Sequence, residues 1–352
     1  MKIELTYILY NDNTNFNDIK NKFNQEKKML GKIGLEEHFA VPETLGDSMI
    51  YFKNNNDIRT TRLLDLLDLR VEEMDKNGMD MMILSLNSPA IQGIYQKDKA
   101  ISTAKLANDK LAEALAKRNE RFRGFAALPL QDPDAAIKEM HRAVEELGFV
   151  GVLVNGYSQI DTEDNYKYLD DPMYDAFWAE LEKMDVPFYM HPREPMPCNS
   201  HYMDGHYALN GAVWLFGVET ASHVLRLMNS GLFDKYPKLK IVIGHLGEGL
   251  PFFLWRADNH LKKRRRDCKA EKPFMQYLVE NIWVTTSGQF YAPALACTMM
   301  AMGTDRILFS TDYPFEEVPD ACNWFDKVSI SEPDRYKIGR QNCIDLFKLD
   351  LK

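Results

Sequence analysis

The stretch KIGLEEH, residues 32–38, is the first of about eight short, largely apolar runs that are rich in strand-forming residues. Runs of this length and composition are typical of buried β-strands. The others are MDMMILSLN (79–87), RFRGFAALPL (121–130), FVGVLVNG (149–156), VPFYMHP (186–192), LKIVIGHLG (239–247), NIWVTTSG (281–288) and RILFSTDYP (306–314). Eight strands are the number found in a TIM (β/α)8 barrel.

The segments between these runs have helical patterning. Residues 60–78 carry apolar side chains at helical spacing and end on Gly78. Residues 131–148 begin with Asp132 as a helix cap and Pro133 at the first helical position. Strict alternation of apolar strands and helices predicts an α/β fold with a parallel sheet covered by helices. The strand count favours a closed barrel over an open sheet, and no glycine-rich phosphate fingerprint follows the first run.

The chain has 352 residues, of which 45% are hydrophobic and 27% charged, proportions typical of a globular protein. We expect one catalytic barrel domain over residues 29–352. Residues 1–28 are rich in Asn and Lys and are expected to form a flexible N-terminal extension, with Met29 as an alternative start. No apolar run reaches the roughly 18–20 residues of a membrane span, and no signal peptide is recognisable, so we expect a cytoplasmic protein without a membrane partner.

Charge and cysteine content exclude other classes of function. A net charge of −9 argues against nucleic acid as a partner, because phosphate binding requires clustered Lys and Arg. The basic run LKKRRRD, residues 261–267, follows an apolar segment and is interpreted as a solvated helix end. The five cysteines form no C-x-x-C pair and are expected to be reduced thiols.

Polar residues gather where the predicted strands end. In a TIM barrel these carboxyl ends form the catalytic face. The residues found there are Glu36, Glu37, His38, Asn87, Asn155, His191, His245, Glu248 and Asp312. Since residues two apart on a strand share a face, Glu36 and His38 are expected to face one centre while Glu37 points away.

Four of these residues predict a metal site. Glu36, His38, His191 and Asp312 form a mixed nitrogen and oxygen set that suits Zn²⁺, Mn²⁺ or Fe²⁺, and the carboxylates favour Mn²⁺ or Zn²⁺. Taken alone, each would fit a hydrogen-bonded wall residue or a turn cap. Their joint occurrence on successive strand ends favours a functional site.

Five longer motifs resemble a known family. They are LEEHFAVPETL (35–45), SLNSPAIQ (85–92), VPFYMHPREP (186–195), GLFDKYPKLKIVIGHLGEGLPFFLWR (231–256) and RILFSTDYPFE (306–316). In this order they resemble the amidohydrolase-related metal-dependent decarboxylases, from about Met29 to the C-terminus. The motif EEHF resembles the sequences of the branch that acts on γ-resorcylate (2,6-dihydroxybenzoate). Relatives that act on other hydroxybenzoates tend to have alanine at the position of His38.

The resemblance implies the chemistry and the assembly. It implies reversible, non-oxidative loss of CO₂ from a hydroxybenzoate, one divalent metal ion per chain, Zn²⁺ or Mn²⁺, and no organic cofactor. It also implies a homo-oligomer, a tetramer or dimer. The metal ligands would be Glu36, His38, His191 and Asp312.

The resemblance also implies roles beside the metal. Asp312 would protonate the ring, and His245, oriented by Glu248, would share or relay that proton. Three further residues are expected to contact the substrate: Arg256 as an anchor, Phe315 as a wall of the ring pocket, and Asn87. A salt bridge between helices is the alternative for Arg256, and a core position is the alternative for Phe315.

Two other functions compete with this interpretation. One is a hydrolase of the same barrel class, in which a metal-activated water attacks a lactone or amide. Its binuclear members bridge two metals with a modified lysine at the end of the fourth strand, where this chain has LVNGY (153–157) and no lysine. The other is a barrel without catalysis, and the complete set of site residues argues against it.

Overall fold

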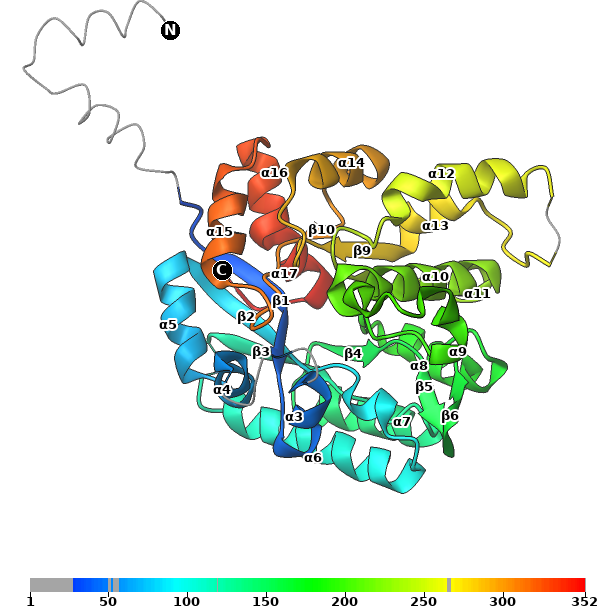
Figure 1. Ribbon diagram of the computed structural model, residues 1–352. Helices are drawn as coiled ribbons and strands as arrows, with labels where there is room; N and C mark the ends of the chain where they lie inside the picture. Colours follow the sequence, from blue (N-terminus) through cyan, green and yellow to red (C-terminus); the bar gives the residue numbers. More distant parts are fainter. Residues whose placement is uncertain (1–27, 50–51, 53–56, 119, 265–266, 352) are drawn as a thin grey trace, which may run out of the picture.

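The computed structural model describes residues 28–49, 52, 57–118, 120–264 and 267–351. Eight parallel strands lie in the order β1-β2-β3-β4-β7-β8-β9-β10, and helices surround them (Figure 1). Their bounds are β1 Lys32–Phe39, β2 Met79–Leu86, β3 Phe122–Ala126, β4 Gly151–Asn155, β7 Phe188–His191, β8 Ile241–Ile243, β9 Ile282–Thr285 and β10 Ile307–Leu308. Seven of them lie within the predicted runs, and β1 extends one residue beyond its run, to Phe39, so the predicted barrel is confirmed.

Helices follow the strands and cover the outside of the sheet. They are α3 Pro42–Met49, α4 Ile58–Leu64, α5 Asp68–Asn77, α6 Lys97–Leu115, α7 Pro133–His141, α8 Asp175–Met184, α9 Pro197–Ser200, α10 Leu215–Asn229, α11 Leu232–Lys235, α12 Leu250–Leu261, α13 Phe274–Asn281, α14 Ala292–Met302, α15 Val318–Lys327, α16 Glu332–Tyr336 and α17 Asn342–Phe347. A short antiparallel hairpin, β5 Ser158–Ile160 and β6 Thr162–Lys167, follows β4 and was not predicted.

The predicted helix ends are confirmed. The Asp132 carboxylate accepts a hydrogen bond from the Ala135 N–H at 3.0 Å, and Pro133 is the first residue of α7. Helix α5 ends at Gly78, whose left-handed backbone (φ 69°) lets its N–H return to the Met74 carbonyl. This conformation favours glycine, because a side chain would clash with the backbone.

Two apolar clusters make the core. One fills the barrel and is covered at the bottom by the C-terminal α17 through Leu346 and Phe347. The other lies between the sheet and the helices around it. Buried polar side chains gather at the carboxyl ends of the strands, among them Glu36, His38, Asn155 and His191, and this end of a barrel is the one used for chemistry.

A bulge in β1 sets the direction of its polar end. The pairing with β2 shifts between Gly34 and Glu37: Gly34 pairs with Met82 and Glu37 with Leu84, so β1 has one extra residue in this interval. A bulge of this kind redirects the side chains that follow it. Leu35 therefore packs inside the barrel, and Glu36 can join the site directly above it.

Side chains and one loop contact close the seam between β10 and β1. The Ser310 hydroxyl accepts hydrogen bonds from the Leu35 N–H at 3.2 Å and the Glu36 N–H at 2.7 Å. Above it, the His38 N–H donates to the Tyr313 carbonyl at 2.6 Å.

Two further predictions concern the N-terminal extension and membrane spans. Residues 1–27 of the predicted extension lie outside the described residues, so that part stays a prediction. In the part of the chain that the structure describes, no helix has the length and apolar character needed to cross a membrane.

Candidate metal centre and active site

The four predicted ligands meet at the carboxyl end of the barrel. Glu36 and His38 come from β1, His191 ends β7, and Asp312 follows β10. One ligand atom from each lies within 4.8 Å of the others. The His191 Nε2 is 3.3 Å from Glu36 Oε1, and the His38 Nε2 is 3.3 Å from Asp312 Oδ1. The structure thus brings together side chains that lie far apart in the sequence.

The inner atoms of this cluster fit a divalent cation. Glu36 Oε1 and His38 Nε2 are buried and have no hydrogen-bond partner within the described structure. Buried polar atoms are normally paired, so unpaired atoms that converge on one point favour a bound ion. Two imidazoles and two carboxylates are a donor set that Mn²⁺ and Zn²⁺ accept.

Hydroxyl groups hold the outer side of Glu36. Its Oε2 accepts hydrogen bonds from the Tyr189 hydroxyl, from the Ser287 hydroxyl and from the Thr285 hydroxyl at 3.1 Å. These contacts leave Oε1 to face the centre. Burial raises the pKa of Glu36, and the nearby histidines and Ser287 oppose that shift. The sequence interpretation missed this group, although the run TTS at the end of β9 was its signal.

A hydroxyl group also orients His38. The Ser85 hydroxyl lies 3.1 Å from His38 Nδ1 and faces it from the neighbouring strand β2. In the tautomer with the proton on Nδ1, this N–H donates a hydrogen bond to the Ser85 hydroxyl oxygen, and the lone pair of Nε2 faces the centre. Gly244 gives room beside this cluster, because a Cβ there would lie 2.9 Å from Glu36 Oε2.

Glu37 points away from the cluster and binds the chain that carries Asp312. Its carboxylate accepts hydrogen bonds from the Ser310 hydroxyl at 3.1 Å, the Thr311 N–H at 3.0 Å and the Tyr313 N–H at 3.3 Å, and also from the Thr311 hydroxyl. Burial raises the pKa of Glu37 to about 7, with the bonds from Thr311 and Ser310 opposing that shift. Glu37 therefore fixes the strand end on both sides of Asp312.

His245 and Glu248 lie beside the cluster in a left-handed turn. The backbone has positive φ from His245 to Gly249, including 52° at both His245 and Glu248. Such angles at non-glycine residues are sparsely populated and gather at functional sites. The turn places His245 Nδ1 2.7 Å from Glu248 Oε1 and Nε2 3.8 Å from Asp312 Oδ2.

The surroundings of His245 and Asp312 shift the pKa values of these two groups in opposite directions. Burial alone would lower the pKa of His245, but the charges of Glu248 and Glu36 and the contact with Asp312 raise it well above the ordinary value. Burial alone would raise the pKa of Asp312, but its close contacts with His245 and His38 lower it to about 2. Before any metal is considered, the pair therefore consists of an imidazolium and a carboxylate.

The three predicted substrate residues lie in different surroundings. Phe315 is half-buried and meets the His38 ring edge-on, with centroids 5.6 Å apart. Arg256 is exposed on α12. Asn87 is fully buried, donates to the Thr44 carbonyl and the Ser48 hydroxyl, and accepts from the Thr44 hydroxyl. These bonds use both amide hydrogens, so the structure favours a role for Asn87 in fixing α3 over the predicted substrate contact.

The end of β4 carries an asparagine where binuclear hydrolases of this barrel class have a lysine. Asn155 stands there, and its amide donates to the Asn87 carbonyl at 3.0 Å and the Pro89 carbonyl at 3.3 Å. Within the described ranges, one group of possible ligands converges closely enough to hold an ion.

Comparisons with known proteins identify relatives of this chain. A family model described as Amidohydrolase matches residues 57–349. A γ-resorcylate decarboxylase from Rhizobium sp. is 53% identical over 326 residues, which are 92% of this chain and 99% of that protein. A crystal structure of a 2,6-dihydroxybenzoate decarboxylase complexed with 2,6-dihydroxybenzoate is 52% identical, with a TM-score of 0.89 over 91% of this chain and 100% of that one.

A third comparison includes a metal. The dihydroxybenzoic acid decarboxylase from Polaromonas sp., solved with bound manganese and the inhibitor 2-nitroresorcinol, is 52% identical. Its TM-score is 0.89, over 92% of this chain and 98% of that one. The resemblance found in the sequence is thereby confirmed. This chain belongs to the amidohydrolase family, and within it to the group that contains the γ-resorcylate decarboxylases.

Proposed function

We propose that the chain is a metal-dependent carboxy-lyase that converts 2,6-dihydroxybenzoate to resorcinol and CO₂, reversibly and without oxidation. The observation that carries the proposal is the convergent cluster of Glu36, His38, His191 and Asp312. It lies in a chain that is 53% identical to a γ-resorcylate decarboxylase over nearly the full length of both proteins. We assign the four residues as ligands of one divalent ion per chain, Mn²⁺ by preference and Zn²⁺ as the alternative.

The reaction has to avoid a carbanion in the plane of the ring. Protonation of the carbon that bears the carboxylate breaks aromaticity for a time and lets the neighbouring hydroxyl, as a ketone, accept electrons when the C–C bond to CO₂ breaks. When bound, the metal ion supplies a Lewis acid and a template for the substrate oxygens. The protein residues supply the fixed geometry and the proton.

Three residues handle the proton in this proposal. Asp312 Oδ2 and His245 Nε2 are 3.8 Å apart and border the same space, so either atom can serve the carbon above the cluster. Glu248 holds the other side of the imidazole through its 2.7 Å contact with Nδ1. Phe315, edge-on to His38, is placed to limit where the ring lies. This arrangement suits general acid catalysis, in which the proton stays on the ring carbon when CO₂ leaves and the acid takes a new proton from solvent.

The function is tested by turnover in D₂O. With Mn²⁺ supplied, 2,6-dihydroxybenzoate is expected to give resorcinol that carries deuterium at the former carboxyl carbon, faster than 2,3-dihydroxybenzoate or salicylate react. A chelator is expected to abolish turnover, and one equivalent of Mn²⁺ per chain to restore it. Activity confined to a control acid would move the chain to another branch. Hydrolysis of a lactone or amide without decarboxylation would favour the alternative function, a metal-dependent hydrolase of the same barrel class.

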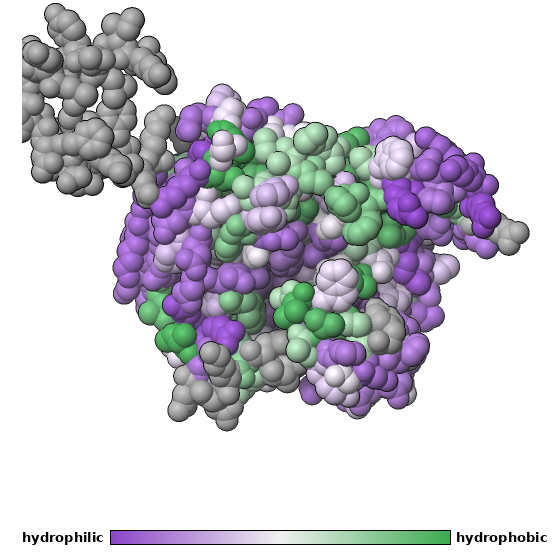
Figure 2. Space-filling model, turned by 45° about the horizontal axis from the view of Figure 1, so that its top comes forward, coloured by the Kyte–Doolittle hydropathy of each residue, from purple (hydrophilic) through white to green (hydrophobic). Residues whose placement is uncertain are grey.

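We also propose that the chain forms a homo-oligomer, a tetramer or dimer. Helix α12 presents Phe252, Phe253 and Trp255 with 72%, 59% and 69% of their surfaces exposed. The space-filling view shows hydrophobic residues grouped on its forward face between hydrophilic margins (Figure 2). Large exposed aromatic side chains in a group are typical of an interface.

The assembly state has its own test. Light scattering of the purified chain is expected to give the mass of a dimer or tetramer, and a change of Phe253 to Asp is expected to shift the mass toward the monomer, since a charge would then enter an apolar interface. The matched change at an exposed position on another helix, Ile58→Asp on α4, should have a smaller effect on the mass if α12 is the interface. A monomer for the unchanged chain would contradict the proposal.

A further inference from the structure

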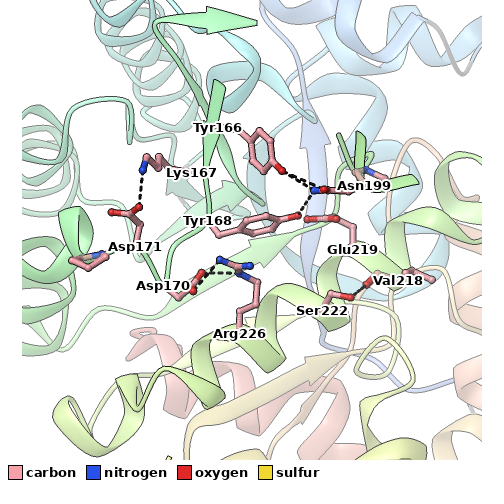
Figure 3. Close-up of a pocket in the computed structure, with 12 residues that line it drawn as sticks. Tyr166, Lys167, Tyr168, Asp170, Asp171, Asn199, Val218, Glu219, Ser222 and Arg226 are labelled. Atoms are coloured by element: carbon pink, nitrogen blue, oxygen red, sulfur yellow. Dashed lines mark hydrogen bonds and ion pairs between the residues drawn. The ribbon is translucent and has the colours of Figure 1, made fainter. Parts of the chain in front are cut away.

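A cavity of about 620 Å³ lies outside the metal cluster, between the β5–β6 hairpin, α9 and α10 (Figure 3). Its walls include Tyr166 and Tyr168 from the hairpin side, and Glu219 and Arg226 from α10. Glu219 and Arg226 are seven residues apart, so they lie on one face of the helix. The volume lies in the range of small-molecule sites.

The two cations that line this cavity are already neutralised. Arg226 donates from Nε to Asp170 Oδ1 at 2.8 Å and from Nη2 to Asp170 Oδ2 at 3.0 Å. Lys167 donates to Asp171 Oδ2 at 2.9 Å. A bidentate pair of this kind uses the charged edge of the guanidinium. An anion entering the cavity would therefore have to compete with a carboxylate for each cation.

Glu219 is different, because it is an acid without an ion pair in the described structure. Its side chain is only 5% exposed, and Oε1 has no hydrogen-bond partner. Figure 3 shows its carboxylate beside Tyr168 and Asn199. A buried acceptor without a partner is destabilising unless a donor reaches it. Burial raises the pKa of Glu219, and the Tyr168 hydroxyl and Arg193 oppose that shift, so a cation nearby would further favour the ionised form.

Two aromatic rings, those of Tyr166 and Tyr168, form one part of the wall. Tyr166 and Tyr168 meet edge-to-face at 5.7 Å, and Tyr157 packs behind both at 5.3 Å and 5.5 Å. Arg226 already lies 4.2 Å from the Tyr168 ring centroid, which shows that this wall accepts a cation on its face. Aromatic rings beside a carboxylate oxygen that has no hydrogen-bond partner, Glu219 Oε1, suit an organic cation better than a hydrated metal ion.

We propose that this cavity binds a small organic ammonium ion, with the cationic group at Glu219 and the carbon chain against Tyr166 and Tyr168. The site is separate from the metal cluster and goes beyond the proposed decarboxylation. Its ligand class follows from charge and shape alone, so it stands or falls independently of the enzyme activity.

The test compares three probes of equal size by saturation-transfer NMR on the full-length protein: butylammonium, 1-butanol and butyrate. Butylammonium is expected to bind at least about tenfold more tightly than 1-butanol, since a charged hydrogen bond adds more than about 1.4 kcal/mol. Glu219→Gln should reduce butylammonium binding to the level of the alcohol. The control, Glu113→Gln, changes an exposed glutamate on α6 and should leave binding unchanged.

A second variant covers the case in which Glu219→Gln fails to fold. Tyr166→Leu removes one aromatic wall at a half-buried position and should weaken butylammonium more than 1-butanol. Three outcomes would each overturn the proposal: equal binding of the alcohol and the ammonium ion, a preference for butyrate, or full binding of butylammonium by a folded Glu219→Gln protein.

Discussion

Replacement of Asp312 by asparagine is expected to lower kcat for 2,6-dihydroxybenzoate by about 10²–10⁴-fold, the range typical of a lost acid–base group. Asparagine keeps the shape of the aspartate side chain and one oxygen that can face the metal, but its amide cannot act as an acid or a base. The backbone at Asp312 has a φ of 72°, a conformation that asparagine tolerates well. The fold should therefore survive, and the loss should fall on turnover.

The measurement is kcat at saturating Mn²⁺, together with metal content per chain and the thermal unfolding curve. His245→Asn separates proton transfer from metal binding, because His245 is not among the four proposed ligands. We expect that variant to keep its metal and still lose turnover by a similar factor. The control is Asp305→Asn, at an exposed side chain that pairs with Lys337. Near-normal turnover in both active-site variants would remove Asp312 and His245 from the proton path.

The barrel could be predicted from the sequence because its signals are local. Each strand of the barrel is a short apolar run, and Pro133 and Gly78 mark helix ends by their own backbone preferences. The β5–β6 hairpin was missed, because the strand Thr162–Lys167 is polar and largely exposed. Its pattern lacks the apolar alternation that predicts a half-buried strand.

The four proposed ligands could be located for a related reason. Strand ends of a parallel barrel meet at one face, so Glu36, His191 and Asp312 follow from topology once the strands are known. The bulge in β1 could not be foreseen, because it depends on how two strands pair. Likewise, the Tyr189 and Thr285 hydroxyls reach Glu36 across 153 and 249 residues of sequence.

Two other features depend on three-dimensional context. Gly247 and Gly249 indicate a turn after β8, but nothing local shows that His245 and Glu248 also adopt left-handed backbone. The aromatic residues of α12 could have been core or interface from their sequence alone. Their exposure excludes a core position, which would have buried them, and the interface stays a proposal.

The second large effect is expected at Glu37, which has no place among the proposed ligands. Glu37→Ala should lower the free energy of unfolding by about 1–3 kcal/mol, because the buried Thr311 N–H would lose its acceptor. The Tyr313 N–H would keep the Thr311 hydroxyl as an acceptor at 3.2 Å and should add less. Glu37→Gln keeps one acceptor oxygen and should have a smaller effect. Both should also weaken Mn²⁺ binding by about 10–100-fold, the range for lost support of a metal ligand.

The two consequences are measured separately. Urea unfolding in the presence of a chelator gives the free energy of unfolding without any contribution from metal. A Mn²⁺ titration followed by electron paramagnetic resonance then gives the affinity of the folded protein. The control is Glu72→Ala, at an exposed glutamate on α5, where a change within about 0.5 kcal/mol is expected. If Glu37→Ala matched this control in stability and in Mn²⁺ affinity, the bonds from Glu37 to Ser310, Thr311 and Tyr313 would not be what holds Asp312 in place. The seam would then depend on the bonds that the Ser310 hydroxyl accepts from the Leu35 and Glu36 N–H groups, and on the His38 N–H bond to the Tyr313 carbonyl.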